Sequence, residues 1–247
     1  MDKQELRKRC WQALQDAGAA RFPGTLGRIP NFVGAERAAE RLAATPELQR
    51  AQVVKCNPDS PQRPLRHRLL KAGKTIFLAV PRLAEARPFW ELDPSRLPEG
   101  SLWEASSIKG AAGLGRAVSL EEMPPIDLIV TGCVGVDRRG ARLGKGGGFS
   151  DLEFALLRET GKVEADTIVA TLVHESQVLL AGTIPMQSHD QSLDIIATPE
   201  RLIRCDRRFE RPGGILWDRL DPAKRSEIPV LRNGGPGRSG KNIDAEK

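Results

Sequence analysis

Residues 126–151 read IDLIVTGCVGVDRRGARLGKGGGFSD, and this stretch says more about the fold than any other. Its first part, residues 126–136, is apolar and β-branched, which is typical of a buried strand. Ser150 and Glu153 stand in the spacing of a capping box, which predicts that a helix begins there. A glycine-rich loop therefore joins a predicted strand to a predicted helix.

The loop itself predicts an anion site. Five of the nine residues 140–148 are glycine, so several backbone amides are free to point at one centre, and Arg142 and Lys145 add positive charge. A glycine run alone is more often a flexible connector. The strand, the helix start and the two cations together favour a phosphate cradle. The loop has neither the Gly-Lys-Ser/Thr of a Walker loop nor the third glycine of a dinucleotide fingerprint.

Helical and strand-like patterns alternate along the chain. We predict helices over 3–17, 33–44, 60–72 (with Ser60 as N-cap) and 151–160, and further strands over 53–55, 75–80, 166–173, 177–180 and 193–197. Residues 81–125 are expected to hold loops and one short helix. The alternation predicts one α/β domain over residues 1–210, a three-layer α/β/α fold with a mostly parallel sheet. Residues 211–247 are basic, rich in Gly and Pro and without apolar periodicity, so we predict a disordered tail.

Composition narrows the function classes. The chain has 247 residues, a net charge of +6, no tyrosine and three histidines, which disfavours a histidine-based metal cluster or triad and suits an anionic small-molecule ligand. The first residues are charged and there is no long apolar run, so we expect no membrane span, no signal peptide and a cytoplasmic location. The four cysteines are scattered and are expected to be reduced thiols. The sequence leaves the oligomeric state open.

Four segments, in order, carry a family resemblance. They are the opening helix with Lys3 and Arg7, the strand GKTIFLAVP (73–81), the loop RLGKGGGFSD (142–151) and the stretch HDQSLDIIATP (189–199). Between about residues 3 and 204 the chain resembles the 5-formyltetrahydrofolate cyclo-ligase family, also called methenyltetrahydrofolate synthetases. The loop is similar to that family's Arg-x-Gly-x-Gly-Gly-Gly-Tyr-Tyr-Asp pattern, and the last stretch to its His-Asp-x-x-x-Asp-x-Ile-x-Thr-Pro pattern.

The resemblance implies a reaction and a set of site residues. The family transfers the ATP γ-phosphoryl group to the formyl oxygen of 5-formyltetrahydrofolate, and ring closure by the neighbouring nitrogen releases phosphate and leaves the 5,10-methenyl product with ADP. Such chemistry depends on positioning and on charge rather than on a nucleophilic side chain. By resemblance, the residues that hold ATP are Lys3, Arg7, Gly144, Lys145, Gly146, Gly147, Gly148 and Phe149. The implied catalytic residues are Arg142, Lys145 and Asp151, and the implied Mg²⁺ ligands are Asp151, Asp190 and Asp194.

Several positions depart from the family pattern and leave the substrate open. Phe149 and Ser150 replace the paired tyrosines, and Asn57 and Asp59 stand where a folate-contacting glutamate is expected. The stretch 57–66 resembles a divergent branch linked to thiamine metabolism. The substrate is therefore a reduced folate or a related heterocycle, and one alternative is a paralogue that binds ATP or another phosphate ligand without folate activity.

Structural roles compete with these functional ones. Asp151 and Glu153 could simply stabilise a helix start, and Lys3 and Arg7 could lie on a solvated helix face. A second alternative function is nucleic-acid binding through the late basic residues, although no aromatic platform accompanies them. Those residues are Arg207, Arg208, Arg211, Arg219 and the basic residues within 224–241.

Overall fold

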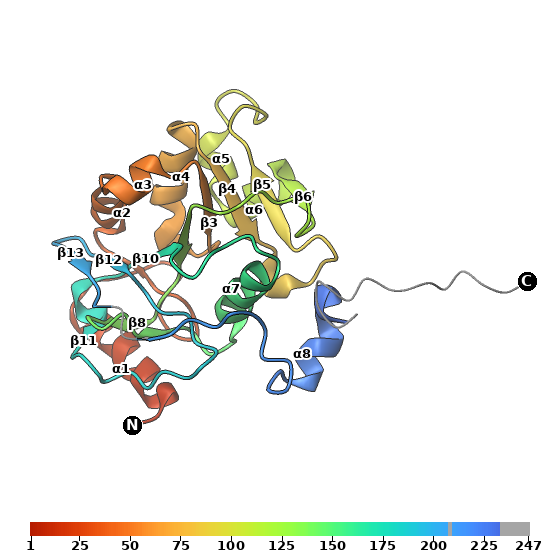
Figure 1. Ribbon diagram of the computed structural model, residues 1–247. Coiled ribbons are helices and arrows are strands. Elements are labelled where there is room, and N and C mark those ends of the chain that lie inside the picture. The colour runs from red at the N-terminus through yellow and green to blue at the C-terminus, as the bar shows by residue number, and fades with distance from the viewer. Residues whose placement is uncertain (207–208, 233–247) are drawn as a thin grey trace, which may run out of the picture.

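An eight-stranded sheet forms the centre of the computed structural model, which describes residues 1–206 and 209–232 (Figure 1). The strand order is β13-β12-β10-β7-β3-β4-β5-β6. The central strands from β12 to β4 pair in parallel, whereas β13, β5 and β6 are joined by antiparallel pairing. The strands are β3 (Val53–Cys56), β4 (Thr75–Ala79), β5 (Phe89–Leu92), β6 (Arg116–Val118), β7 (Leu128–Thr131), β10 (Ile168–Leu172), β12 (Ile195–Ala197) and β13 (Leu202–Arg204).

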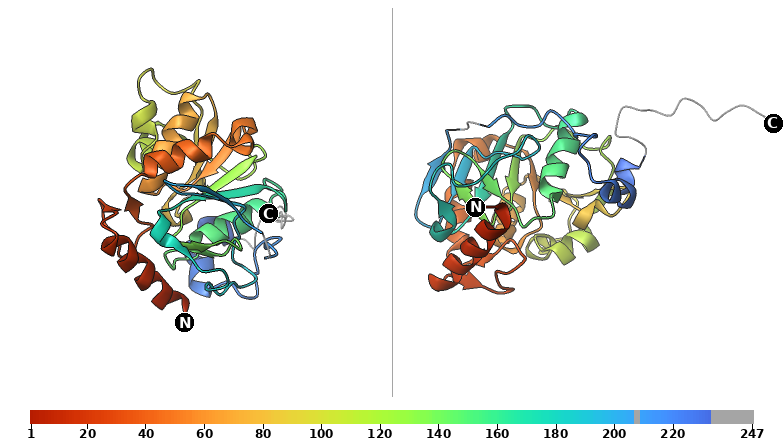
Figure 2. Two further views of the ribbon diagram at one scale, coloured as in Figure 1. Left: turned by 90° about the vertical axis from the view of Figure 1, so that its left-hand side faces the viewer. Right: turned by 90° about the horizontal axis from the view of Figure 1, so that it is seen from below.

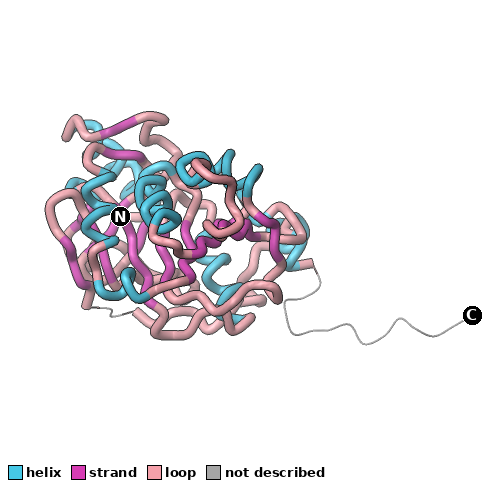
Figure 3. Tube along the Cα trace, turned by 90° about the horizontal axis from the view of Figure 1, so that it is seen from above, coloured by secondary structure: helices cyan, strands magenta, loops and turns pink. Residues whose placement is uncertain are grey.

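Helices cover both faces of this sheet, with α2 and α7 on opposite sides (Figure 2). The helices are α1 (Lys3–Asp16), α2 (Ala35–Ala43), α3 (Pro46–Arg50), α4 (Arg63–Lys71), α5 (Leu102–Ala105), α6 (Ile108–Leu114), α7 (Phe149–Glu159) and α8 (Pro222–Glu227). Two small sheets are formed by β1 (Ala20–Arg21) with β2 (Asn31–Phe32), and by β11 (Val178–Leu179), β8 (Gly135–Asp137) and β9 (Arg142–Leu143). Figure 3 shows the strands enclosed between helical layers.

The central strands bury side chains on both faces, which explains their nearly continuous apolar sequences. Along β4, Ile76 and Leu78 belong to the core beneath α2 and α4, whereas Phe77 and Ala79 belong to the core that contains the inner face of α7. The same alternation occurs in β12, where Ile196 faces the α7 side. The predicted three-layer fold with a mostly parallel sheet is confirmed.

The predicted strand over 126–136 is wrong in one respect. It divides into β7, in the central sheet, and β8, in the small sheet. The break occurs at Gly132, where a Cβ would collide with the carboxylate of Asp59. The glycine-rich loop therefore follows β9 rather than the buried strand itself.

Two other element predictions need correction. The edge strands β5 and β6 lie within 81–125, a proline-rich and charged region that we expected to be loops and one short helix. The predicted N-cap at Ser60 is wrong. Ser60 is the first residue of a short 3₁₀ turn, whose N-cap is Asp59 and has no side-chain cap bond, and α4 starts only at Arg63.

The predicted domain boundary at 210/211 is also wrong. Ile228 and Leu231 are 2% and 0% exposed and belong to the α7-side core together with Ile215. Their spacing is irregular because most of the segment is not helical, so no periodicity revealed it. The prediction of disorder for 233–247 lies outside the described residues.

Two expectations from composition can be compared with the structure. Among residues 1–206 and 209–232, no helix is both long enough and apolar enough to cross a bilayer. All four cysteines are free thiols, as predicted, and three of them are buried.

Candidate active site

A cleft of about 930 Å³ opens at the carboxyl ends of the central strands. It is lined by residues that follow β3 (Asn57), β4 (Val80) and β7 (Gly132). The chain runs from β3 outward to β4 in one direction and from β7 outward to β10 in the other. The cleft therefore lies where the strand order reverses, which is the usual ligand site of open α/β sheets, and its volume suits a small-molecule site.

The glycine-rich loop forms one wall of this cleft. Residues 144–148 all line it, as does Phe149 at the first turn of α7. Gly146 and Gly148 have φ values of 107° and 69°, a region in which other residues are strained. Because α7 begins directly after Gly148, the unpaired amides of its first turn lie at the cleft.

The predicted capping box at Ser150 is wrong. Gly148 is the N-cap and has no side-chain cap bond, so the helix begins earlier and Ser150 lies inside its first turn. The Ser150 hydroxyl instead accepts a hydrogen bond from Asn57 Nδ2 at 3.2 Å. Glu153, predicted to reach back to the cap, is buried and contacts Lys55.

Four cations predicted for the site line the cleft together. Lys3 Nζ lies 2.5 Å from Asp190 Oδ2, and Arg7 Nε donates to Gly144 O at 2.7 Å. Lys3 and Arg7 therefore do not lie only on a solvated helix face, because both contact other residues of the cleft. Lys145, which is exposed on the loop, and the buried Arg142 complete the group.

Arg142 and Asp151 form the most deeply buried ion pair of the loop. Arg142 Nη2 lies 2.5 Å from Asp151 Oδ1, and their side chains are 3% and 14% exposed. Asp151 Oδ1 also accepts the Gln191 amide at 3.0 Å. Burial raises the pKa of the Asp151 carboxyl, but the Arg142 guanidinium, the Gln191 amide and Lys3 together hold that pKa below its usual value.

The structure does not bring Asp194 to the cleft, which corrects the predicted set of three aspartates. Asp194 directly precedes β12 and so lies at the amino ends of the parallel strands, away from the cleft. There its Oδ2 accepts a hydrogen bond from Val169 N and lies 2.5 Å from Arg211 Nη2. Asp151 and Asp190 do line the cleft. In the part of the chain that the structure describes, no three His, Cys, Asp or Glu side chains cluster as a metal site.

A buried polar network at the cleft was not predicted. Lys55, 2% exposed, pairs with Glu153, 5% exposed. Asn57 Nδ2 donates to Ser150 Oγ and to Glu153 Oε2, each at 3.2 Å. A lysine inside an apolar strand was the only local signal, because its partner lies on α7, far along the chain.

Arg66 builds the loop after β3. It is 1% exposed and donates to the carbonyls of Asn57 at 2.6 Å and Asp59 at 3.0 Å. Its guanidinium therefore holds the backbone of this loop. The neighbouring His67 packs edge-on against Trp103.

Asp59 lines the cleft beside the Arg66-bound loop. Burial raises the pKa of its carboxyl, an effect that Lys145 and Arg66 partly offset. A raised pKa favours the neutral carboxyl group, which can donate a hydrogen bond to a ligand as well as accept one.

Backbone strain marks the turn after β4. Arg82 and Leu83 have φ values of 60° and 51°, and such strain in non-glycine residues gathers at functional sites. Leu83 is buried and anchors the turn, whereas Arg82 is exposed and lines the cleft. Arg82 is thus a further cleft cation that the sequence reasoning missed.

Comparisons with known proteins identify the family of the chain. A family model for the 5-formyltetrahydrofolate cyclo-ligase family matches residues 1–199. Proteins from Mus musculus and Bos taurus, both named methenyltetrahydrofolate synthase domain-containing protein, are 35% and 33% identical over 234 residues. These alignments cover 94% of this chain but 63% and 62% of those proteins, so the chain spans about three fifths of their length.

More distant similarities extend to proteins named as the enzyme. A probable 5-formyltetrahydrofolate cyclo-ligase of Schizosaccharomyces pombe is 26% identical over 176 residues, covering 67% of this chain and 83% of that protein. The NMR structure of Aquifex aeolicus 5,10-methenyltetrahydrofolate synthetase matches with a TM-score of 0.53 at 20% identity, covering 89% of this chain and 100% of that one. That likeness supports the fold alone.

Proposed function

The chain belongs to the 5-formyltetrahydrofolate cyclo-ligase family, and we propose that it closes the ring of 5-formyltetrahydrofolate, or of a related heterocycle, at the expense of ATP. In that reaction the γ-phosphoryl group passes to the formyl oxygen, the neighbouring nitrogen attacks the formyl carbon, and phosphate leaves. The products are the 5,10-methenyl compound, ADP and phosphate.

The observation that carries this proposal is the gathering of cations around the glycine-rich loop. Lys3, Arg7, Arg142 and Lys145 share one cleft with the first-turn amides of α7. Of these cations, Lys145 is exposed on the loop, which suits it to contact phosphate oxygens directly. Positive charge and oriented amides stabilise the charge that develops in phosphoryl transfer.

The polar groups beside the loop suit the heterocycle. Asn57, Asp59 and Glu153 line the cleft from the β3 loop and from α7, and they offer amide and carboxyl groups to a ring that carries N–H donors. We propose that they orient the formyl-bearing ring towards the glycine-rich loop.

Asp151 is the residue that we propose to face a Mg²⁺ ion carried by the triphosphate. Mg²⁺ commonly takes one or two carboxylates together with phosphate oxygens and water, so a dedicated cluster of side chains is not required. When bound, the ion would neutralise phosphate charge. Asp151 is held in its ionised form by Arg142, as the lowered pKa indicates.

A second candidate is a paralogue that binds ATP or another phosphate ligand without folate activity and acts on a heterocycle of thiamine metabolism. The observation that favours it is the replacement of the paired loop tyrosines by Phe149 and Ser150, together with the bond from Asn57 to Ser150 within the cleft.

A single assay distinguishes the folate cyclo-ligase from the paralogue without folate activity. With ATP, Mg²⁺ and 5-formyltetrahydrofolate, we expect the absorbance of the methenyl product to rise, and to stay flat without ATP. No product, with ATP still raising the melting temperature, would overturn the folate assignment in favour of the paralogue. A thermal-shift panel of folates and thiamine phosphates would then show which class of heterocycle the cleft accepts.

A further inference from the structure

The segment 209–232 lies beyond the part of the chain that matches the family model and runs along α7 (Figure 1). Near the end of α7, Glu159 accepts the Ile215 amide at 2.9 Å and Trp217 Nε1 at 3.2 Å. Near its start, Lys224 of α8 contacts the glycine-rich loop. The segment is therefore fastened at both ends of the helix that follows the loop.

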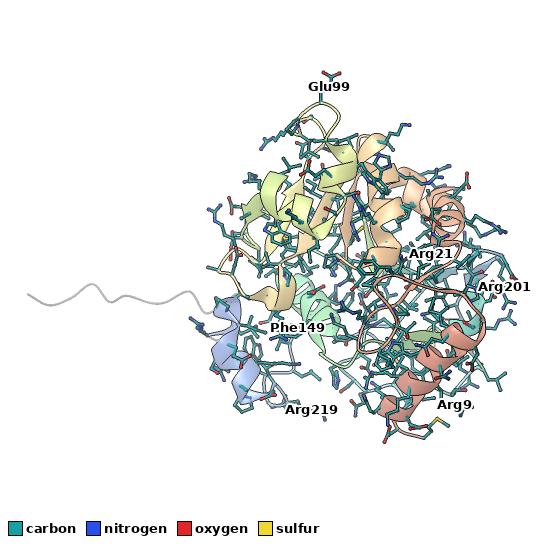
Figure 4. The ribbon with its side chains drawn as sticks, turned by 180° about the vertical axis from the view of Figure 1, so that it is seen from behind. Arg9, Arg21, Glu99, Phe149, Arg201 and Arg219 are labelled. Atoms are coloured by element: carbon teal, nitrogen blue, oxygen red, sulfur yellow. The ribbon has the colours of Figure 1, made fainter. Side chains whose placement is uncertain are left out.

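The contact at the loop is specific. Lys224 Nζ donates to Gly147 O at 2.6 Å and lies 5.3 Å from the centre of the Phe149 ring. Figure 4 shows Phe149 beside the C-terminal helix. A Cβ on Gly148 would approach Lys224 Nζ to 2.9 Å, so the ammonium group lies directly against this glycine.

The contact between Lys224 and Gly147 O also fixes the direction of the Gly148 N–H. Lys224 does not line the cleft, whereas Gly147 and Gly148 do. In a trans peptide the carbonyl and the following N–H point in opposite directions. By binding Gly147 O from outside the cleft, Lys224 turns the Gly148 N–H away from itself.

We propose that Lys224 is a positioning residue for phosphate binding: it holds the Gly147–Gly148 peptide so that the Gly148 amide faces the cleft. This rests on the proposed function, because it assigns an amide donor to the same nucleotide phosphates. It adds a contribution from α8, a helix outside the family match. Fixing the peptide in advance removes an ordering cost from binding.

The test compares Lys224→Ala with Lys224→Arg and with the matched control Arg225→Ala. Arg225 is the neighbouring cation of α8, and it lies over the Trp217 ring. We expect Lys224→Ala to weaken ATP binding about tenfold, the usual effect of losing one charge-assisted hydrogen bond, with adenosine affinity unchanged. Lys224→Arg should restore most of the affinity, and Arg225→Ala should leave it intact.

Two further readouts separate positioning from stability. In turnover, the KM for ATP should rise in Lys224→Ala while kcat changes little, as expected when ground-state binding is lost. Without nucleotide, amide hydrogen exchange at 146–149 should quicken in Lys224→Ala and not in Arg225→Ala.

Unchanged loop exchange in Lys224→Ala would overturn the proposal, as would unchanged ATP affinity or an equal loss in Arg225→Ala. Absence of ATP binding by the wild type would instead reject the proposed function, while the exchange comparison would still test the role of Lys224 in holding the loop.

Discussion

Replacing Glu153 by leucine is expected to lower the free energy of unfolding by about 3–5 kcal/mol. The substitution leaves the Lys55 ammonium buried without its carboxylate, and breaking a buried pair by removing one partner is strongly destabilising. Lys55 then keeps only the weaker contact to Asn57 Oδ1 at 3.3 Å. Chemical denaturation, followed by circular dichroism, measures the loss.

The double variant Lys55→Met/Glu153→Leu is the control. Replacing both charges by apolar groups of similar volume is often neutral for stability, so most of the loss should be recovered. Because Glu153 lines the cleft, the refolded double variant should still lack turnover. A loss below about 1 kcal/mol in the single variant, or a double variant no more stable than the single one, would show that this pair is not the buried, coupled network described above.

The second large effect is expected at Arg142. Arg142→Met removes the guanidinium from the Asp151 carboxylate, which is itself largely buried, so we expect a loss of about 3–5 kcal/mol at pH 7. ATP binding should fall with it, because the loop between these residues loses its internal ion pair.

The pH dependence of this loss distinguishes electrostatics from packing. In the wild type the pKa of Asp151 is lowered, so its stabilising effect is complete above its unfolded pKa, near 4, and is lost as the pH falls through the folded value. In Arg142→Met burial, which raises that pKa and is the largest single effect on it, is opposed only by the Gln191 amide and by Lys3, so we expect the pKa to rise. The variant should therefore regain part of its stability as the pH falls from 7 towards about 4.5. An equal loss at both pH values in urea titrations would assign the effect to packing alone.

Local sequence patterns predicted the scaffold and much of the cleft wall. The apolar strands at 75–80 and 193–197 and the loop glycines have short-range signatures, so they could be recognised before their partners were known. Lys3 and Arg7 became site residues only through the family resemblance, since a helix face alone does not show what it packs against.

Contacts across long stretches of sequence could not be predicted. The pairing of Lys55 with Glu153, and of Asp194 with Arg211, depends on how strands and helices assemble. A lysine inside an apolar strand shows that a partner is needed, but not which residue supplies it. The capping pattern predicted that Ser150 is the N-cap of α7, whereas the N-cap is Gly148, which has a left-handed backbone. Leu231 was missed because irregular segments bury side chains without periodicity, and the contact of Lys224 was missed because its partner, the Gly147 carbonyl, lies far away in the sequence.

Calorimetric titration of the protein with ATP, in the presence of Mg²⁺, tests the central claim most directly. The account predicts saturable binding at a single site, weakened by about 1–3 kcal/mol in Lys145→Ala through loss of a charge-assisted contact to phosphate. The matched variant Lys162→Ala, whose ammonium binds the carbonyls of Glu121 and Met123, should bind ATP as the wild type does. Absence of saturable ATP binding by the wild type, or equal ATP affinity in the wild type and Lys145→Ala, would contradict the account.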